Sequence, residues 1–271
     1  MDKTIEQIKQ NGIENYVRTT FNAKHKIKKL MKKYATAYYE GSALISDLDF
    51  EVLIDTLKYI NSADKYLTTP GWGYKIKHGK KHIYGKVGTL PYFYEYKDII
   101  SLFNSQKVII TPKFDGINYV AYYKNGKFKI CATRGNGKVG KNISWAYNND
   151  LKISQALNNK TFAINGEVIL QQPLTQQRDT VANYLNKKKQ KNTNIIFMPF
   201  CLFNTNLDYL AQIQKIQNFN IHPPFLIFEQ LPSNKELTNL FDNFKREYQI
   251  DGLVLTTPDK STQIAFKFKN N

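Results

Sequence analysis

The stretch Val108-Ile109-Ile110-Thr111-Pro112-Lys113-Phe114-Asp115-Gly116 decides the fold of this chain. It places a lysine at the end of a β-branched run, with a carboxylate two residues later and a glycine directly after that. A second run of apolar and aromatic residues, 117–123, follows at once. Such residues favour strands, so two strands are predicted to meet beside Lys113. This arrangement can hold one amine in a pocket beside a phosphate, and Lys113 is therefore our candidate nucleophile.

The rest of the chain after residue 107 also alternates between strand and helix patterns. Lys124-Asn125-Gly126 separates two alternating runs and predicts a hairpin, because Asn-Gly suits the tight turns that join antiparallel strands. Strands joined by hairpins, with inserted helices, favour an α+β fold over a parallel doubly wound sheet. Further strands are expected at 162–170, 194–203, 252–256 and 263–268, and helices at 208–219 and 235–248.

The N-terminal part has a different character and suggests a separate module. Residues 1–62 show helical spacing of apolar residues, and Ser46 followed by Asp49 resembles a helix start with a capping box. Residues 63–106 contain glycine, aromatic and basic clusters and are expected to be a basic linker that enters the core. We therefore expect three segments: a helical module at 1–62, the linker at 63–106 and an α+β domain at 107–271.

Composition indicates the kind of partner and excludes several classes of site. The formal net charge is +17 and the sequence pI is about 9.6, which favours a polyanionic partner such as nucleic acid. Two cysteines and four scattered histidines provide neither a disulfide framework nor a zinc site. The N-terminus lacks an apolar signal core and no apolar run is long enough to span a bilayer, so a soluble intracellular protein with no membrane contact is expected.

One glycine-rich segment has the same residue pattern as a dinucleotide-binding motif. Gly135-Asn136-Gly137-Lys138-Val139-Gly140 matches the letters of that motif. The motif requires a preceding strand and a helix that opens from it, whereas the strand here belongs to a hairpin and Lys141 to Ser144 is a poor helix start. The dinucleotide-fold interpretation is set aside, and a turn beside a nucleotide site stays open.

Five charged residues stand in strand-like apolar surroundings, where an unpaired charge is costly. One such residue would indicate a structural salt bridge, but five with these signs suggest a site built for phosphate and a metal ion. They are Lys113, Arg134, Glu167, Asp251 and Lys267.

In order and spacing, this series resembles the adenylation domain of NAD+-dependent DNA ligases, which are covalent nucleotidyltransferases. The resemblance covers 108–268, and the segment 45–51 resembles the helical NMN-binding module of the same family. The resemblance implies a helical module followed by an antiparallel-sheet, ATP-grasp-like nucleotidyltransferase domain. It also implies that the protein uses NAD+ and Mg2+ as cofactors and acts on nicked duplex DNA.

The resemblance also implies a role for each site residue. Lys113 would attack the α-phosphorus of NAD+, release NMN and hold AMP as a phosphoramidate, assisted by Lys267 and Mg2+. Asp115 would contact the ribose or order the site, and Glu167 and Asp251 would be the metal-side carboxylates. The remaining contacts with the cofactor are expected from Tyr38, Asp47, Phe50, Glu51, Thr89, Leu90, Thr111, Gly116, Arg134 and Arg178.

Departures from the family pattern, among them Phe50 and Glu51 where the NMN-binding module has a tyrosine and an aspartate, keep other interpretations open. Thr111 stands where the family has a glutamate that reads the adenine edge, and Thr256 stands where it has a lysine. The chain also ends soon after Phe268, without the OB-fold, zinc finger, helix-hairpin-helix and BRCT domains of full ligases. Either a separate OB-fold-containing partner subunit is therefore expected, or the chain is a natural or engineered fragment of a longer ligase. An ATP-dependent DNA or RNA ligase and a non-catalytic nucleic-acid-binding protein on a ligase fold are the alternatives.

Overall fold

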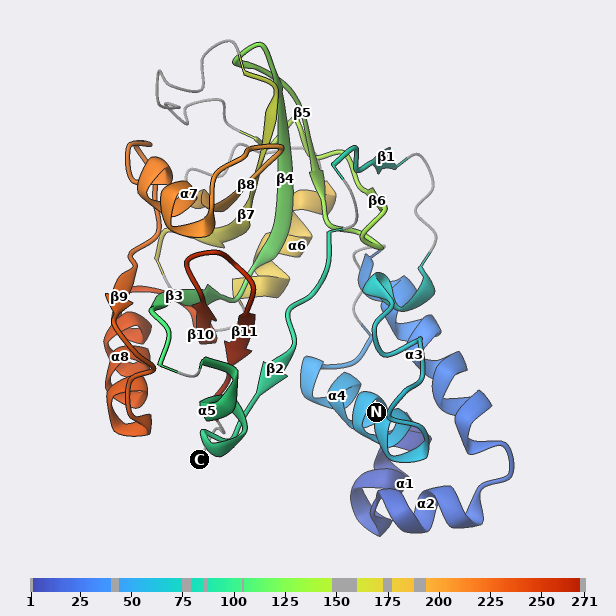
Figure 1. The fold of residues 1–271 in the computed structure, drawn as a ribbon. Helices are drawn as coiled ribbons and strands as arrows, with labels where there is room; N and C mark the ends of the chain where they lie inside the picture. Colours follow the sequence, from blue (N-terminus) through green and yellow to red (C-terminus); the bar gives the residue numbers. More distant parts are fainter. Residues whose placement is uncertain are drawn as a thin grey trace. The chain divides into compact units, whose positions relative to one another are not determined.

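The chain folds as two compact units (Figure 1), here called the helical unit, residues 1–89 with 135–141, and the sheet unit, residues 90–134 with 142–271. The structure is a computed structural model. It describes residues 2–39, 44–74, 79–84, 87–103, 105–147, 160–172, 177–187 and 194–268. The mixture of helices and antiparallel strands confirms the predicted α+β class.

The helical unit forms because apolar residues recur at helical spacing and bury one common face. Ile8, Ile27, Met31 and Leu57 are almost fully buried in its core. Ser46 caps its fourth helix by accepting a hydrogen bond from the backbone N–H of Asp49 at 3.1 Å, as predicted. The helices are α1 (Lys3–Asn11), α2 (Ile13–Thr19), α3 (Ala23–Tyr39), α4 (Asp47–Ile60) and the 3-10 turn η1 (Pro70–Gly73).

The glycine-rich segment belongs to the helical unit and opens no helix. β6 (Val139–Gly140) pairs antiparallel with β1 (Lys80–Lys81), and the backbone N–H of Val87 donates to the carbonyl of Gly137 at 2.8 Å. Setting the dinucleotide-fold interpretation aside was therefore correct.

The sheet unit contains two sheets. The first has the order β2-β11-β10-β3-β9 and is antiparallel except for the parallel pair of β2 and β11; the second has the order β5-β4-β7-β8 and is antiparallel throughout. Their strands are β2 (Tyr92–Phe93), β3 (Val108–Phe114), β4 (Ile117–Lys124), β5 (Lys127–Thr133), β7 (Phe162–Leu170), β8 (Ile195–Phe203), β9 (Leu226–Phe228), β10 (Ile250–Thr256) and β11 (Gln263–Phe266).

Four helices pack against these sheets. α6 and the end of α7 share a core with the four-stranded sheet, whereas α5 and α8 cover one face of the five-stranded sheet. Ile99 and Phe103 of α5, which lie in the segment expected to be a linker, are fully buried. The helices are α5 (Lys97–Phe103), α6 (Gln177–Lys187), α7 (Tyr209–Ile216) and α8 (Asn234–Glu247).

The β4–β5 hairpin turns where the Asn-Gly dipeptide predicted it. Asn125 and Gly126 have φ values of 53° and 69°. Positive φ at both central positions defines the type I′ turn, whose twist matches that of the flanking strands. On its other edge, β4 pairs antiparallel with β7, the strand that carries Glu167.

Candidate active site

Two lysine side chains of the sheet unit meet at one carboxylate, that of Asp251. Lys113 Nζ lies 2.7 Å from Asp251 Oδ1, and Lys267 Nζ lies 2.9 Å from Asp251 Oδ2. Their side chains are between 19% and 31% exposed, so the group is mostly shielded but still accessible to solvent. Three of the five charged residues singled out by their apolar surroundings therefore form one cluster.

Strand pairing brings these residues together. Lys113 is opposite Gly252 in the β3–β10 ladder, and a register shift between Ile250 and Gly252 lies at Asp251. Leu253 of β10 is opposite Phe266 of β11, and Lys267 follows directly. A Cβ at position 252 would lie 2.4 Å from the carbonyl oxygen of Phe266, so a glycine is needed for this close approach.

The alternation of side chains along β3 places Lys113 on the face away from the apolar core of α5 and α8. Val108 and Ile110 pack into that core, and Ile109 packs on the opposite face against α7. Because side chains in a strand alternate between faces, Thr111 and Lys113 share the face of Ile109.

The electrostatic environment of Asp251 maintains its negative charge. Burial by itself would raise the pKa of Asp251. The charges and hydrogen bonds of Lys113 and Lys267 outweigh this effect and lower its pKa below the usual value. Asp251 is therefore an ionised group that positions two amines at neutral pH.

Glu167 occupies a neighbouring position on β7 with different electrostatics. Burial raises the pKa of Glu167 to about 7, although the positive charges of Lys113, Arg134 and Arg178 act in the opposite direction. Its Oε2 also accepts a long hydrogen bond, 3.4 Å, from Nδ2 of Asn118, the residue opposite it on β4. All five charged residues therefore belong to one electrostatically coupled region of the sheet unit.

The turn that contains Asp115 and Gly116 is fixed by β7 and α6. A Cβ on Gly116 would lie 2.1 Å from the carbonyl oxygen of Val168, so only glycine fits this contact. Gln177, at the start of α6, donates from Nε2 to the carbonyl of Asp115 and accepts at Oε1 from the backbone N–H of Leu170 at 3.1 Å. This amide fixes the position from which α6 presents Arg178.

The two threonine departures are parts of one feature. Thr111 on β3 and Thr256 on β10 are 4% and 0% exposed. Both hydroxyls interact with the hydroxyl of Tyr209, a buried residue of α7, and the hydroxyl of Thr256 accepts a hydrogen bond from Gln263 Nε2 at 3.2 Å. The acid and base of the family pattern are thus replaced together by a neutral, hydrogen-bonded hydroxyl cluster.

The residues expected to contact the NMN half of the cofactor lie in the helical unit. Tyr38 is half-buried near the end of α3 and Glu51 is exposed on α4. Phe50 packs edge-on against Trp72, with ring centroids 5.5 Å apart. The backbone of Asp47 begins α4, but its side chain lies outside the described residues. Their role in binding stays a prediction.

Thr89 and Leu90 lie in a segment without regular secondary structure before β2, where Thr89 is exposed and Leu90 is half-buried. This is also the boundary between the two units. Their role in binding the cofactor stays a prediction as well.

No preformed metal cage is visible among the described residues. Within the ranges that the structure covers, no three His, Cys, Asp or Glu side chains gather closely enough to hold a metal ion. Both carboxylate oxygens of Asp251 already contact lysines. By contrast, Asn118 Oδ1 is buried and has no hydrogen-bond partner in the described structure. Its orientation is set because Nδ2 donates to Asn165 Oδ1 at 3.0 Å and to the carbonyl of Gly166 at 2.9 Å.

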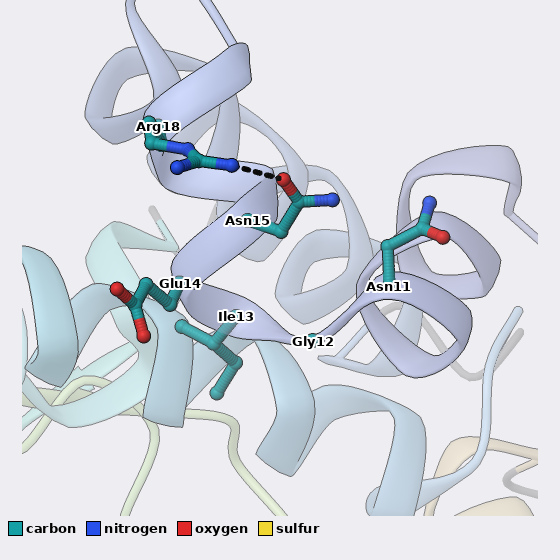
Figure 2. Close-up of a pocket in the computed structure, with 6 residues that line it drawn as sticks. All are labelled: Asn11, Gly12, Ile13, Glu14, Asn15 and Arg18. Atoms are coloured by element: carbon teal, nitrogen blue, oxygen red, sulfur yellow. Dashed lines mark hydrogen bonds between the residues drawn. The ribbon is translucent and has the colours of Figure 1, made fainter.

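A surface hollow lies elsewhere, at the junction of α1 and α2 (Figure 2). There the Arg18 guanidinium donates to Asn15 Oδ1 at 3.4 Å, and Gly12 links the two helices with a φ of 79°. None of the site residues predicted from the sequence lines this hollow.

Several contacts in the site were not foreseen from the sequence. Asn118 could have been noticed as a polar residue inside an apolar strand pattern, and Gln177 as a polar residue that follows such a pattern. Tyr92 lies beneath Lys267, with the ammonium 5.4 Å from the ring centroid. Tyr209 looked like one core aromatic among many. No local pattern indicates these partners, because each contact joins distant parts of the chain.

Comparisons with known proteins relate this chain to DNA ligases. Residues 90–199 match the family model described as the NAD-dependent DNA ligase adenylation domain. A DNA ligase of Borreliella afzelii is 26% identical over 86% of this chain and 41% of its own length. A DNA ligase of Acanthamoeba polyphaga mimivirus is 26% identical over 83% of this chain and 38% of its own length. The chain thus spans about two fifths of the length of these curated relatives.

Solved structures give weaker likenesses. An RNA ligase of Naegleria gruberi with ATP and Mn has a TM-score of 0.48 and 18% identity over 72% of this chain and 60% of that one. An archaeal ATP-dependent RNA ligase has a TM-score of 0.48 and 13% identity over 68% of this chain and 48% of that one.

Among the described residues, no helix combines the length and the apolar character needed to cross a membrane. The chain contains a segment, 90–199, that matches the NAD-dependent DNA ligase adenylation domain, and it is similar to curated DNA ligases over most of its length.

Proposed function

We propose that this chain attaches AMP to its own Lys113, using NAD+ as the donor, and passes the AMP to the 5′-phosphate of a nick in duplex DNA. The observation that carries the proposal is the position of the Lys113 amine. It is held 2.7 Å from Asp251, which also holds Lys267 at 2.9 Å. This arrangement supplies one nucleophilic amine and a second cation beside it.

The first step forms one bond and breaks one. Lys113 Nζ, after losing a proton, attacks the α-phosphorus of NAD+. A P–N bond forms as the bond between the α-phosphorus and the bridging oxygen of the pyrophosphate breaks, and NMN leaves with that oxygen on its phosphate. An amine attacks only when it is unprotonated. Lys267 stabilises the negative charge that develops on the phosphoryl oxygens.

Mg2+ fits this site through Glu167 and Asn118 better than through Asp251. Magnesium is held by one or two protein oxygens together with substrate phosphates. The orphaned Oδ1 of Asn118 and the carboxylate of Glu167 come from directly paired positions, whereas both oxygens of Asp251 contact lysines. When bound, the ion would neutralise phosphate charge in the transition state. Asp251 remains a proposed metal-side carboxylate if the nucleotide draws Lys267 away.

NAD+ is the proposed donor because the matched family model carries that name and because the segment around Ser46 resembles an NMN-binding module. We propose that Tyr38, Asp47, Phe50 and Glu51 contact the NMN half. Thr111, Gly116, Arg134 and Arg178 would contact the AMP half, as would Thr89 and Leu90. A separate OB-fold-containing subunit is the proposed partner for sealing.

The test is incubation of the full chain with Mg2+ and NAD+ labelled in the AMP moiety, followed by denaturation and detection of protein-bound label. We expect acid-labile label on the native chain and none on Lys113→Ala. Lys127→Ala, a change at an exposed lysine of β5, is the matched control and should retain the label.

Each result decides between the functions considered. Label from ATP but not from NAD+ would overturn the choice of donor and favour an ATP-dependent ligase. Absence of label from both donors, with duplex binding intact, would favour a non-catalytic nucleic-acid-binding protein. Sealing of a nicked duplex by the labelled chain, with and without an OB-fold subunit, tests the transfer step.

A further inference from the structure

One face of α3 carries a stripe of cations that no acid of the helix balances. The helix contains six lysines, one histidine and no Asp or Glu. Ala23, Ile27, Met31, Tyr34 and Ala35 are buried along one side. At about 100° per residue, the exposed cations fall on the opposite side within an arc of about 120°. This exposed set, here called the α3 stripe, consists of His25, Lys26, Lys29, Lys32 and Lys33.

Asp64, a buried acid beside this helix, is paired with lysines outside the stripe. Lys24 Nζ and Lys28 Nζ each lie 2.8 Å from a carboxylate oxygen of Asp64, whose side chain is 5% exposed. Within the part of the chain that the structure describes, no lysine of the α3 stripe forms a salt bridge. These two ion pairs with Asp64 fix the helix. In the stripe itself, Lys33 interacts electrostatically with Asp2, which accepts a hydrogen bond from Tyr34, whereas Lys26, Lys29 and Lys32 have no ion-pair partner among the described residues.

An ordinary solvated helix face carries charges of both signs, and α8 is an example in this chain. Its sequence carries Lys235, Lys245 and Arg246 together with three acids, Glu236, Asp242 and Glu247, so its charges cancel. In α3 the pairs Lys26–Lys29 and Lys29–Lys33 are like charges at helical spacing, which destabilise a helix. The stripe is therefore not a device for helix stability, and lysine-rich composition alone does not explain why this helix lacks acids.

We propose that the α3 stripe binds the sugar–phosphate backbone of nucleic acid. Lys26 and Lys33 are separated by seven residues, or about 10 Å along the helix. That length matches about three phosphate steps of one strand of a duplex, at 3.4 Å each along the axis. Lysine ammonium groups neutralise phosphates as point charges, and such contacts position a nucleic acid without reading its sequence.

This inference deepens the proposed function by naming a surface that holds the DNA, and it rests on that function only for the choice of a nicked substrate. The stripe belongs to the helical unit, whereas Lys113 belongs to the sheet unit. Failure of the two proposals can therefore be distinguished. Lys113→Ala should bind duplex normally, and a variant of the stripe should accept AMP normally in the absence of DNA.

The experiment compares two triple variants of the full chain that remove equal charge. One is Lys26→Gln with Lys29→Gln and Lys33→Gln; the other, on α8, is Lys235→Gln with Lys245→Gln and Arg246→Gln. Each lowers the formal net charge by three, from +17 to +14. Binding to a fluorescent nicked duplex is measured by anisotropy at several salt concentrations, with single-stranded DNA and double-stranded RNA as further probes.

We expect the α3 variant to reduce the slope of log K against log [salt] by about 2 to 3, since each lost phosphate contact removes about 0.9. Its affinity should fall at least tenfold at the lowest salt concentration. The α8 variant should change the slope by less than 1. Replacing the same three α3 lysines by arginine should restore binding. The thermal midpoint of the α3 variant should not fall, because the change removes like-charge repulsion.

Three results would overturn the proposal. Equal losses in the two triple variants would show that binding follows total charge and not the stripe. An unchanged slope in the α3 variant would show that these lysines contact no phosphates. Binding of the stripe to vesicles that contain phosphatidylserine, with no effect of the variant on nucleic acid, would assign it to an anionic lipid surface.

Discussion

Lys113 Nζ and Asp251 Oδ1 are 2.7 Å apart and come from strands β3 and β10, 138 residues apart in sequence. The carboxylate accepts from Lys267 at its other oxygen, so Asp251 sets the positions of both amines. In the proposed reaction one of these amines becomes the nucleophile and the other stabilises the phosphate. Asp251 is thus a positioning residue in the structure described here, and this role can be separated from metal binding.

Replacing Asp251 by asparagine should keep the shape of the side chain and remove the charge that holds the two lysines. We expect the rate of AMP attachment to Lys113 to fall by about 10² to 10³, comparable to the loss of one charge-stabilising group in a reaction centre. Rapid-quench labelling with NAD+ measures this rate. Asp259→Asn, on the exposed β10–β11 turn, should leave it unchanged. A shift in the Mg2+ concentration for half-maximal rate, without loss at saturation, would instead indicate that Asp251 binds the metal.

Replacing Gly252 by alanine should disturb the position of Lys267. The added Cβ would meet the carbonyl oxygen of Phe266 at 2.4 Å, and backbone atoms cannot yield as a side-chain tip can. We expect a loss of stability of about 1–3 kcal/mol, as for overpacked sites, and a large loss of AMP attachment. Gly88→Ala is the matched control, since nothing lies within 4 Å of its Cβ. Similar thermal midpoints for the two variants would contradict the close approach of β10 and β11.

Replacing Tyr209 by phenylalanine tests the hydroxyl cluster. The change removes the interactions of the Tyr209 hydroxyl with the nearly inaccessible hydroxyls of Thr111 and Thr256, although Thr256 keeps its hydrogen bond from Gln263. We expect the free energy of unfolding to fall by about 1–3 kcal/mol, measured by urea denaturation. Tyr59→Phe, at a 56% exposed position of α4, should cost much less. Equal effects of the two changes would show that the Tyr209 hydroxyl makes no net contribution.

The sequence predicted features that depend on neighbours in the chain. Ser46 as a helix cap and Asn125-Gly126 as a hairpin turn are decided by local backbone geometry, and both predictions are confirmed. α6 was not predicted, because its sequence is mostly polar and, among its apolar side chains, only Val181 and Leu185 are deeply buried. Its stability depends on packing against β7, which no local pattern reports.

The same distinction applies to the site. Lys113 and Asp251 could be selected because each is a charge in an apolar strand, and the structure brings them into contact. The bridge from Tyr209 to two threonines depends on how α7 packs against the five-stranded sheet. Strand order and helix packing determine this contact, and residue spacing along the sequence carries no information about it.

The helical unit should lose part of its stability in acid because of Asp49. The hydrogen bond from Lys9 lowers the pKa of Asp49 below its usual value, against the opposing effect of burial. Because the folded pKa is depressed, the contribution is present above the unfolded pKa of about 3.9 and is lost as the pH falls through the lower folded value. Lys9 is 41% exposed, so solvent screening limits the expected contribution to about 1 kcal/mol.

Asp49→Asn should therefore unfold at a lower urea concentration than the native chain at pH 7, and the difference should shrink below about pH 4. Asp55→Asn is the control on the same helix, since the side chain of Asp55 is 58% exposed and pairs with Lys58 at the surface. Such a pair contributes little, so this variant should match the native chain at both pH values. A gap between Asp49→Asn and the native chain that stays constant from pH 7 to pH 3 would show that packing of the side chain, and not its charge, stabilises the helical unit.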